Sequence, residues 1–337
     1  MEWGSRPRFV GTAEKGERLV NRRFRFGLAV LSLLALAGAG LYLGAFVNPK
    51  FWAFALSLRL PRLGGMVLAA FAVSAASLVF QTLIRNTIVT PCLLGMNSLY
   101  VLIHTAVVFA AGAGSAFATS PFGTFVLDIG LMGAVAGLVY YKLFKATKGN
   151  VLYILLIGTV LATFFSSIQG TLIRLMDPND YNALLSSLVA SFTQVNAAVM
   201  VPGGLLLALV AVWLRNDLAV LDVLALGRET AVNLGIEYEA VIRRLMVGVA
   251  LYVAVATAVV GPLSFLGLIT ANISRQIFKT YRHSVLIAGS VWVGIVILIA
   301  GEFFVEHAVT YSVPVSVFVT IGGGLYFLYL ILKEGRA

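Results

Sequence analysis

The sequence predicts an all-α polytopic membrane protein with ten transmembrane helices, and three observations support this fold class. First, 60% of the 337 residues are hydrophobic and only 11% are charged, whereas a soluble domain of this length needs more charge on its surface. Second, apolar segments of about 20 residues recur, which is the length that crosses about 30 Å of hydrocarbon as helix. Third, the basic residues gather in alternate loops. Strands of a β-barrel would alternate in polarity over roughly 10 residues, and we find no such segments.

The predicted crossings follow one another with short connections. The first predicted crossing, residues 26–47, is longer than the apolar region of a signal peptide and lacks a cleavage site of small residues. We therefore interpret it as a retained helix. The segment at 263–278 is short and polar for a crossing. Two further stretches, 177–191 outside and 221–235 inside, are predicted to be helical without spanning. The ten predicted crossings are residues 26–47, 63–84, 92–112, 122–144, 151–173, 194–214, 240–260, 263–278, 284–301 and 313–333.

The distribution of Lys and Arg supports this count independently of hydropathy. If the N-terminus is cytoplasmic and ten crossings follow, all but four of the 24 basic residues fall on the cytoplasmic side; the four are Lys50, Arg59, Arg62 and Arg174. This imbalance is what the positive-inside rule requires. It also explains the net charge of +10, so no nucleic-acid partner is expected. We therefore expect one membrane domain at 26–333, with both termini, the tails at 1–25 and 334–337, in the cytoplasm.

Nothing in the sequence predicts an enzyme or a resident cofactor. No phosphate-binding loop of the form G-x-x-x-x-G-K-[ST] is present, so any ATP that drives the protein would be bound by another polypeptide. The single cysteine, Cys92, excludes a disulfide within the chain. The three histidines, His104, His283 and His307, are not at metal-ligand spacing.

The competing functional class is an ion-coupled secondary carrier. The number of carboxylates within the predicted crossings distinguishes it from an ATP-driven transporter. Such carriers need ionisable residues near the membrane midplane. Asp128 is the only carboxylate that we place within a predicted crossing, and we interpret it as a solvated residue near the outer end of its helix. The scarcity of such groups argues against this class, which would have to use Asp128 or Glu302.

The first informative motif is Arg59-Leu60-Pro61-Arg62 on the predicted outer face. Pro61 predicts the start of a helix, because proline is tolerated in the first turn. Two guanidinium groups placed there are suited to bind carboxylates in a bidentate manner. The alternative is that both side chains extend from a helix end to lipid headgroups.

Two later segments are also informative. In the longest cytoplasmic loop, LDVLALGRETAVNLG at 221–235, Gly227 and Gly235 predict the ends of two short helices. Such an amphipathic pair suits docking to a groove of a partner, although a helix lying on the bilayer is the alternative. At 261–275, GPLSFLGLITANISR predicts a broken helix, and broken helices at membrane depth must be surrounded by protein or line a cavity.

In this order the motifs resemble the FecCD-type permeases of ABC importers, which take up ferric siderophores, haem and cobalamin. The resemblance implies the fold of a type II ABC importer permease over nearly the whole chain. The matching stretches are RLPR at 59–62, QTLIRNTIVTPCLLGMNS at 81–98, LDVLALGRETAVNLG at 221–235, GPLSFLGLITANISR at 261–275 and VPVSVFVTIGGGLYFLYLILK at 313–333.

The resemblance also implies roles for particular residues. Arg59 and Arg62 would receive carboxylates of an extracytoplasmic binding protein. The 221–235 segment would sit in a cleft of the ATPase through Leu224, Ala225, Leu226, Gly227, Arg228, Glu229, Ala231, Leu234 and Gly235. The path would run between two permeases along the fifth and tenth crossings, where the polar or small candidates are Ser166, Ser167, Gln169, Thr171, Thr320, Gly322 and Gly323.

The function that the resemblance implies is movement of a ferric siderophore across the cytoplasmic membrane of a bacterium by alternating access. Haem or cobalamin is the alternative cargo. The expected partners are a second permease, two ATPase subunits that bind ATP and Mg, an extracytoplasmic siderophore-binding protein and membrane lipid; this chain itself would hold no cofactor or metal.

Two departures from the family pattern bear on the second permease. Ala271-Asn272 stands where many relatives have Pro-His, and Glu306 stands where some have another outer arginine. The latter suggests an asymmetric pair in which a different FecCD-type chain supplies the other half. The stretches GMNSLYVLIHT at 95–105 and LMDPNDYNALLSS at 175–187 resemble the branch that forms such heterodimers for catecholate-type siderophores.

Overall fold

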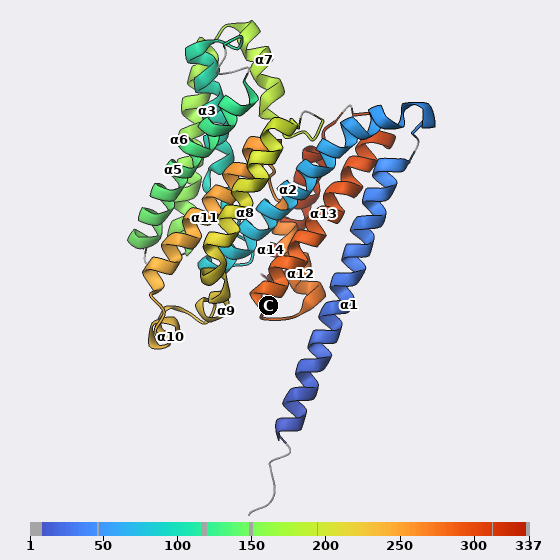
Figure 1. Cartoon of the computed structure of the whole chain (residues 1–337). Helices are drawn as coiled ribbons and strands as arrows, with labels where there is room; N and C mark the ends of the chain where they lie inside the picture. The colour runs from blue at the N-terminus through green and yellow to red at the C-terminus, as the bar shows by residue number, and fades with distance from the viewer. Residues whose placement is uncertain are drawn as a thin grey trace, which may run out of the picture.

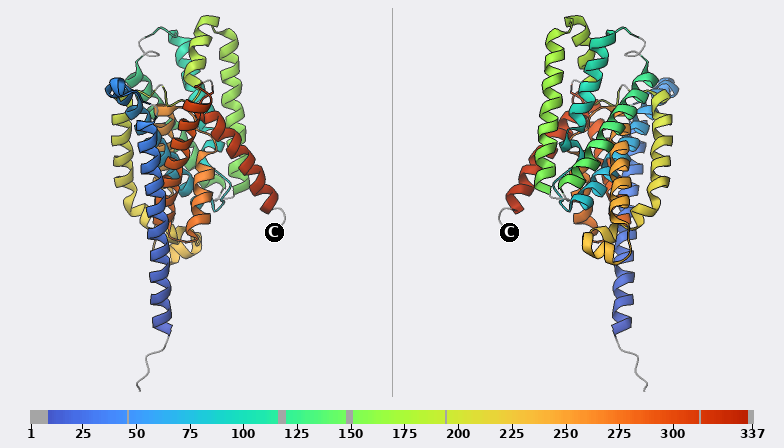
Figure 2. Two further views of the ribbon diagram at one scale, coloured as in Figure 1. Left: turned by 90° about the vertical axis from the view of Figure 1, so that its right-hand side faces the viewer. Right: turned by 90° about the vertical axis from the view of Figure 1, so that its left-hand side faces the viewer.

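The chain folds into a bundle of long helices, shown in Figures 1 and 2. The computed structural model describes residues 9–45, 47–115, 120–147, 151–193, 195–311 and 313–334. Helices and short helical turns make up the regular structure of these residues, and no strand occurs among them, so the predicted all-α class is confirmed. Of the predicted tails, 1–8 and 335–337 lie outside the described residues, whereas residues 9–25 continue the first helix.

The chain crosses the bundle from one end to the other and back (Figure 1). The elements that cross it are α1 (Phe9–Gly44), α2 (Trp52–Ile84), α3 (Met96–Ala111), α5 (Pro121–Thr147), α6 (Val151–Leu175), α8 (Ala197–Ala219), α11 (Tyr238–Val260), α12 (Leu266–Phe278), α13 (His283–Ala308) and α14 (Val315–Glu334). The remaining elements are η1 (Pro49–Phe51), η2 (Pro91–Leu94), α7 (Pro178–Leu188), α9 (Leu221–Leu224) and α10 (Arg228–Asn233).

Within the part of the chain that the structure describes, eight of these helices are long and apolar enough to cross a membrane, so the chain is a multi-pass membrane protein. The other two predicted crossings are shorter: α3 has 16 residues and α12 has 13. At a rise of 1.5 Å per residue, α12 is only about 20 Å long. Ten full-length spanning helices are therefore not reproduced, because a turn before α3 and an extended segment before α12 replace the missing helical turns.

The extended segment at 261–265 confirms the predicted break. α11 ends at Val260, and Gly261 and Phe265 have φ angles of 97° and 61°. Protein surrounds the helix that follows, as expected for a break at membrane depth. Asn272, buried on α12, donates hydrogen bonds to the carbonyls of Thr87 (2.9 Å) and Leu268 (3.0 Å).

The core of the bundle lies around α2, α11 and α13. The apolar windows of α2 and α11 are 78% and 72% buried, whereas that of α6 is only 6% buried. Small residues let α2 approach its neighbours. A Cβ added to Gly267 would lie 1.8 Å from Ser77 Oγ, and one added to Gly294 would lie 2.8 Å from Ser74 Oγ. This close approach is typical of packing between membrane helices.

Two details of the sequence interpretation are wrong. Pro61 does not begin a helix: α2 begins at Trp52 and contains Pro61 in its interior, because the preceding residues from Trp52 to Leu58 are mostly apolar and continue the helix. Asp128 is not solvated either. It is 1% exposed, and its Oδ2 lies 3.1 Å from His104 Nε2 on α3. Since this imidazole supplies a buried polar partner, the carboxyl group can stay inside the bundle.

Candidate functional site

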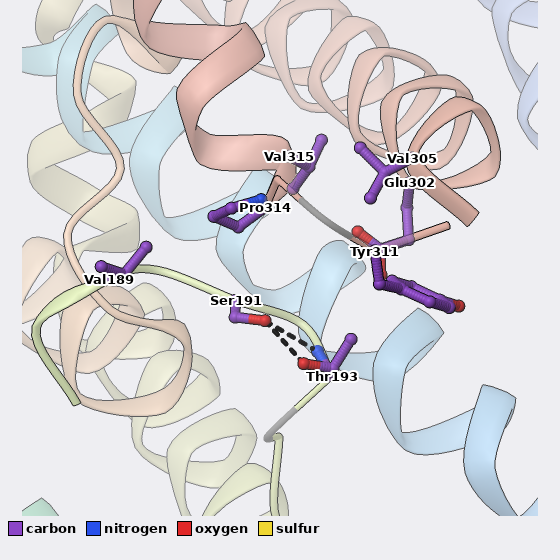
Figure 3. A pocket seen from close by; sticks show the side chains of 8 residues that line it. All are labelled: Val189, Ser191, Thr193, Glu302, Val305, Tyr311, Pro314 and Val315. Atoms are coloured by element: carbon purple, nitrogen blue, oxygen red, sulfur yellow. Dashed lines mark hydrogen bonds between the residues drawn. The ribbon is translucent and has the colours of Figure 1, made fainter. Parts of the chain in front are cut away.

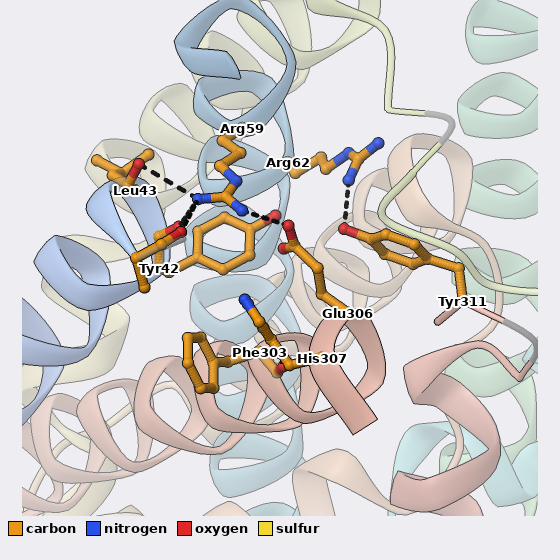
Figure 4. A network of polar contacts seen from close by, with 9 residues as sticks. Tyr42, Leu43, Arg59, Arg62, Phe303, Glu306, His307 and Tyr311 are labelled. Carbon is orange, nitrogen blue, oxygen red and sulfur yellow. Dashed lines mark hydrogen bonds and ion pairs between the residues drawn. The ribbon is translucent and has the colours of Figure 1, made fainter. Parts of the chain in front are cut away.

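Arg59 and Arg62 lie on α2 at one end of the bundle, together with residues from α1, α13 and the loop after α13 (Figure 4). We call this group, formed by Tyr42, Arg59, Arg62, Glu306 and Tyr311, the arginine cluster, and its side of the bundle the arginine end. The opposite side carries α9 and α10 (Figure 1). The predicted assignment of the arginines and the 221–235 segment to opposite faces agrees with this arrangement.

Within the cluster, Arg59 is buried, and both terminal nitrogens of its guanidinium have partners inside the chain. It is 8% exposed. Its Nη1 donates to the carbonyls of Tyr42 (2.7 Å), Leu43 (3.3 Å) and Ala45 (3.1 Å), and its Nη2 pairs with the carboxylate of Glu306. The last carbonyls of a helix lack intrahelical donors, so Arg59 satisfies the end of α1 and fixes it against α2 and α13.

Arg62, one turn further along α2, is the more accessible of the two. Its Nη1 donates to the hydroxyl of Tyr311 at 2.6 Å, and its guanidinium lies 5.2 Å from the centre of that ring. Burial raises the pKa of the Tyr311 phenol above its ordinary value, so the hydroxyl is protonated at neutral pH and accepts through a lone pair. Arg62 is half-buried, and its planar fork of five N–H donors suits a carboxylate.

Glu306 is the residue of this cluster whose role the sequence interpretation missed. We noted it only as a departure from the family pattern, whereas it is the direct partner of Arg59. Glu302, one turn earlier on α13, is also buried at 2% exposure, and its Oε1 has no hydrogen-bond partner among the described residues. The sequence did contain a signal for this role. Glu302 and Glu306 lie four residues apart near the outer end of a predicted crossing, on the same face of the membrane as Arg59 and Arg62, two basic residues that the positive-inside rule does not explain.

A small pocket of about 190 Å³ lies beside the cluster (Figure 3). Glu302, Val305 and Tyr311 form one side of it, and the segment from Val189 to Thr193 forms the other. Hydrogen bonds hold that segment in place: Ser191 N–H donates to the Val260 carbonyl (3.1 Å), and Ser316 Oγ donates to the Ala190 carbonyl (2.7 Å). The pocket is therefore a fixed depression at the arginine end.

The 221–235 segment at the opposite end has the predicted form of two short helices. α9 and α10 are separated by Gly227, and Gly235 follows α10; their φ angles are 110° and 81°. Leu226 and Leu234 are each 63% exposed. Of the other residues assigned to ATPase contact, Leu224 and Ala231 are buried, Ala225 is half-buried, and Arg228 and Glu229 are exposed. The segment thus presents exposed leucines between charged residues, anchored by a buried apolar side.

The residues assigned to a path lie on two helices with exposed faces. On α6, Ser166, Ser167 and Thr171 are exposed and Gln169 is half-buried. On α14, Thr320 and Gly322 are exposed, whereas Gly323 is buried, and a Cβ there would lie 2.3 Å from Phe265 Cβ. Figure 2 shows α14 leaning away from the other helices toward its C-terminal end. The structure does not bring the two sets of side chains together within one chain.

A sequence model of the FecCD transport family matches residues 26–333. The chain belongs to the FecCD transport family. The prediction of a transport protein rather than an enzyme is confirmed by this membership. Like its relatives in the family, the chain has the fold of a type II ABC importer permease, which confirms the predicted fold class.

Two relatives and one solved structure illustrate the similarity. The petrobactin import system permease protein YclO of Bacillus subtilis (strain 168) is 38% identical over 94% of this chain and 99% of that protein. The petrobactin import system permease protein FatC of Bacillus anthracis is 29% identical over 82% of this chain and 78% of that protein. A solved structure of a proposed metal-chelate type ABC transporter, in an inward-facing conformation, matches with a TM-score of 0.78 at 23% identity, over 92% of this FecCD chain and 99% of that one.

Proposed function

We propose that this chain is the membrane-spanning permease subunit of a bacterial ABC importer that moves ferric siderophores across the cytoplasmic membrane. The observation that carries the proposal is the similarity over nearly its full length to a permease named for petrobactin import. Petrobactin is the substrate named for the second relative as well, so a siderophore of that chemical class is the substrate that we would test first.

The topology proposed for the chain places the arginine end outside the cytoplasm and both termini inside. The basic residues support this orientation, because all but four lie in the loops assigned to the cytoplasm. The proposed domain is the helical region at 26–333, which has no separate soluble unit in its sequence. The loaded binding protein would then dock at the arginine end.

In this docking, Arg62 makes the first contact. It lies nearer the surface than Arg59, and its guanidinium fork suits a carboxylate. Arg59 is also a docking residue in our proposal, but it must first exchange Glu306 for a carboxylate of the binding protein. Such an exchange couples docking to a rearrangement of α2 against α13, since Arg59 fixes both to the end of α1.

At the other end, the 221–235 segment receives force from the ATPase. The exposed Leu226 and Leu234 fit an apolar groove of a partner, and an amphipathic helix with its apolar residues in such a groove is a recurrent mode of recognition. The ATPase subunits would bind ATP and Mg, because no phosphate-binding loop is present in this sequence.

A second permease completes the path in this proposal. The exposed faces of α6 and α14 carry small and polar residues beside large apolar ones such as Phe164 and Leu325. Among the described residues of one copy these faces are exposed, and a second permease set against them would enclose a path between the two. The presence of Glu306, which neutralises Arg59, supports a different FecCD-type chain as that second subunit.

The experiment that tests the substrate compares uptake in cells with and without this gene under iron starvation. The labelled substrates are ferric petrobactin, a ferric hydroxamate, haem and cobalamin. We expect loss of ferric petrobactin uptake alone. Loss of haem or cobalamin uptake instead would keep the permease function and overturn the substrate, whereas unchanged uptake of all four would contradict the proposal.

A further inference from the structure

One helix, α13, connects the 221–235 segment with the arginine cluster. His283 is its first residue, and Glu306 lies close to its last, Ala308. With 26 residues at a rise of 1.5 Å each, the helix is about 39 Å long and reaches from one end of the bundle to the other. Figure 1 shows α13 beside α2 in the middle of the molecule, with α9 at the same lower end of the bundle as the start of α13.

At this lower end, the carboxylate of Asp222 on α9 is hydrogen-bonded to the first residue of α13. Asp222 Oδ1 accepts a hydrogen bond from the backbone N–H of His283 at 2.8 Å, and it lies 2.6 Å from His283 Nδ1. A carboxylate can only accept, so the proton of this ring contact lies on Nδ1. His283 is buried at 7% exposure, which holds the contact in one geometry.

Asp222 performs the task of an N-cap residue, although it comes from a different part of the chain. The first N–H groups of a helix have no intrahelical acceptor, and negative charge is favourable there. Arg282, at the N-cap position of α13, provides no side-chain cap. The start of α13 is therefore tied through a carboxylate to the segment that we propose to contact the ATPase.

Between its ends, α13 is one continuous helix. Residues 283–308 contain no proline, and the pair Gly289-Ser290, another common site of helix kinks, lies within an unbroken helical run. Its glycines lie against neighbouring elements: a Cβ at Gly289 would meet the Phe278 ring at 2.1 Å, and one at Gly294 would meet Ser74 on α2. At these points α13 is in close contact with α2 and α12, so the helix is firmly packed between the two ends of the bundle.

At the upper end, the same helix presents Glu306 to Arg59. Arg59 also holds the last carbonyls of α1. α13 therefore carries the contact with Asp222 at one end and the carboxylate partner of Arg59 at the other.

We propose that Asp222 and His283 are positioning residues for transport, which fasten the 221–235 segment to the helix that carries Glu306 at the opposite end. The inference rests on the proposed function, in which that segment contacts an ATPase. It connects the face that we assign to the ATPase, through one helix, with the helix end that presents Glu306 to Arg59.

The test uses the complete transporter, purified with its ATPase and second permease and reconstituted in liposomes, with its binding protein and ferric petrobactin as the probe. The variants are Asp222→Ala and His283→Ala. Because His283 lies outside the 221–235 segment, we expect His283→Ala to keep the ATPase bound and its basal hydrolysis close to wild type. Stimulation of hydrolysis by the loaded binding protein should be lost, and the number of ferric petrobactin molecules imported per ATP should fall several-fold.

Asp222→Asn is the conservative variant, because its amide oxygen still accepts from the backbone N–H of His283. We expect it to retain part of the stimulation. The matched control is Asp217→Ala, which removes a carboxylate at the same end of the bundle that is bound in a bidentate manner to Arg244 at 2.7 Å, between α8 and α11. This variant should lose thermal stability but keep normal stimulation.

The outcomes separate the inference from the proposed function. Wild-type stimulation in Asp222→Ala and Asp222→Asn, or an equal loss of stimulation in Asp217→Ala, would overturn the role of the Asp222–His283 contact. Failure of the unmodified chain to bind an ATPase would instead overturn the proposed function, and this is measured by co-purification before any variant is made.

Discussion

Arg59 on α2 is paired with Glu306 on α13, 247 residues further along the chain, at the end of the bundle that we assign to the binding protein. The pair leaves Arg62 as the accessible cation of the two. Docking at this end therefore begins with one arginine that is available and a second that is held by an internal carboxylate.

Charge reversal at Arg62 should impair docking. For Arg62→Glu we expect the affinity for the loaded binding protein to fall by about tenfold or more, because loss of a hydrogen bond to a charged group costs about 1.5–3 kcal/mol. The binding of the ATPase should be unchanged. The measurement is binding of the binding protein to the reconstituted transporter, followed by uptake.

The matched control is Lys50→Glu, since Lys50 is exposed at the same end and lies in η1, outside the arginine cluster. An equal loss in both variants would mean that only the general charge of this face matters. Normal uptake in the double variant of Arg59→Glu and Arg62→Glu would exclude the docking role of both arginines.

Neutralising Glu306 should raise the affinity for the binding protein, whereas charge reversal at Arg62 should lower it. In Glu306→Gln the ion pair with Arg59 is lost, although the amide oxygen can still accept a hydrogen bond. Arg59 should then receive a carboxylate of the binding protein more readily, and we expect tighter binding of the substrate-free binding protein. Unchanged binding in Glu306→Gln, measured beside wild type, would show that Glu306 does not compete for Arg59.

An exposed leucine of the 221–235 segment offers a test of ATPase docking. Leu226→Arg places a charge where we propose an apolar groove, and desolvating a charge without a partner is costly. We expect little ATPase to co-purify with this variant. Tyr281→Arg is the control, because Tyr281 is 78% exposed in the loop between α12 and α13; loss of the ATPase in both variants would argue against a specific groove at Leu226.

The two glycines of this segment differ in what they tolerate. Gly227 has φ 110° and ψ 167°, a region that is essentially restricted to glycine, and a Cβ there would lie 3.3 Å from Arg85 Nη1. We expect Gly227→Ala to cost about 1–3 kcal/mol of strain and to lower the ATP-dependent transport rate. Gly235 has φ 81° and open space around it, so Gly235→Asn should transport normally; a stronger defect in the Gly235 variant would refute this assignment.

The buried contact between His104 and Asp128 distinguishes a structural role from ion coupling. Asp128→Asn keeps the shape and one acceptor, so uptake should stay close to wild type in the presence of the partner ATPase. Asp128→Ala leaves His104 without its partner and should lower stability by about 1–3 kcal/mol, measured by thermal unfolding in detergent. Uptake that is abolished by Asp128→Asn and by an uncoupler, yet survives loss of the ATPase, would favour the secondary carrier.

Much of the fold follows from local properties of the sequence. Apolar length, the placement of Lys and Arg, and glycine or proline between apolar runs determined the class, the order of the helices, the broken helix before α12 and the two short helices at 221–235. These features depend on the free energy of moving side chains and backbone groups from water into lipid, and on the backbone conformations that each residue type allows. Both are properties of short stretches of sequence. The extension of α2 back to Trp52 was missed because arginines at its outer part resembled the end of a helix.

Only the tertiary structure decided which charges meet. Arg59 with Glu306, Asp222 with His283 and Asp128 with His104 each join different helices, and their separations along the chain follow no period. The first two pairs join positions at least 61 residues apart. The sequence by itself determined that a few polar residues lie within or next to membrane helices. Each of them needs a polar partner there, because a polar group without one is costly in lipid. Which partner each one finds depends on the packing of whole helices, and that packing is decided by side-chain volumes summed over the entire bundle.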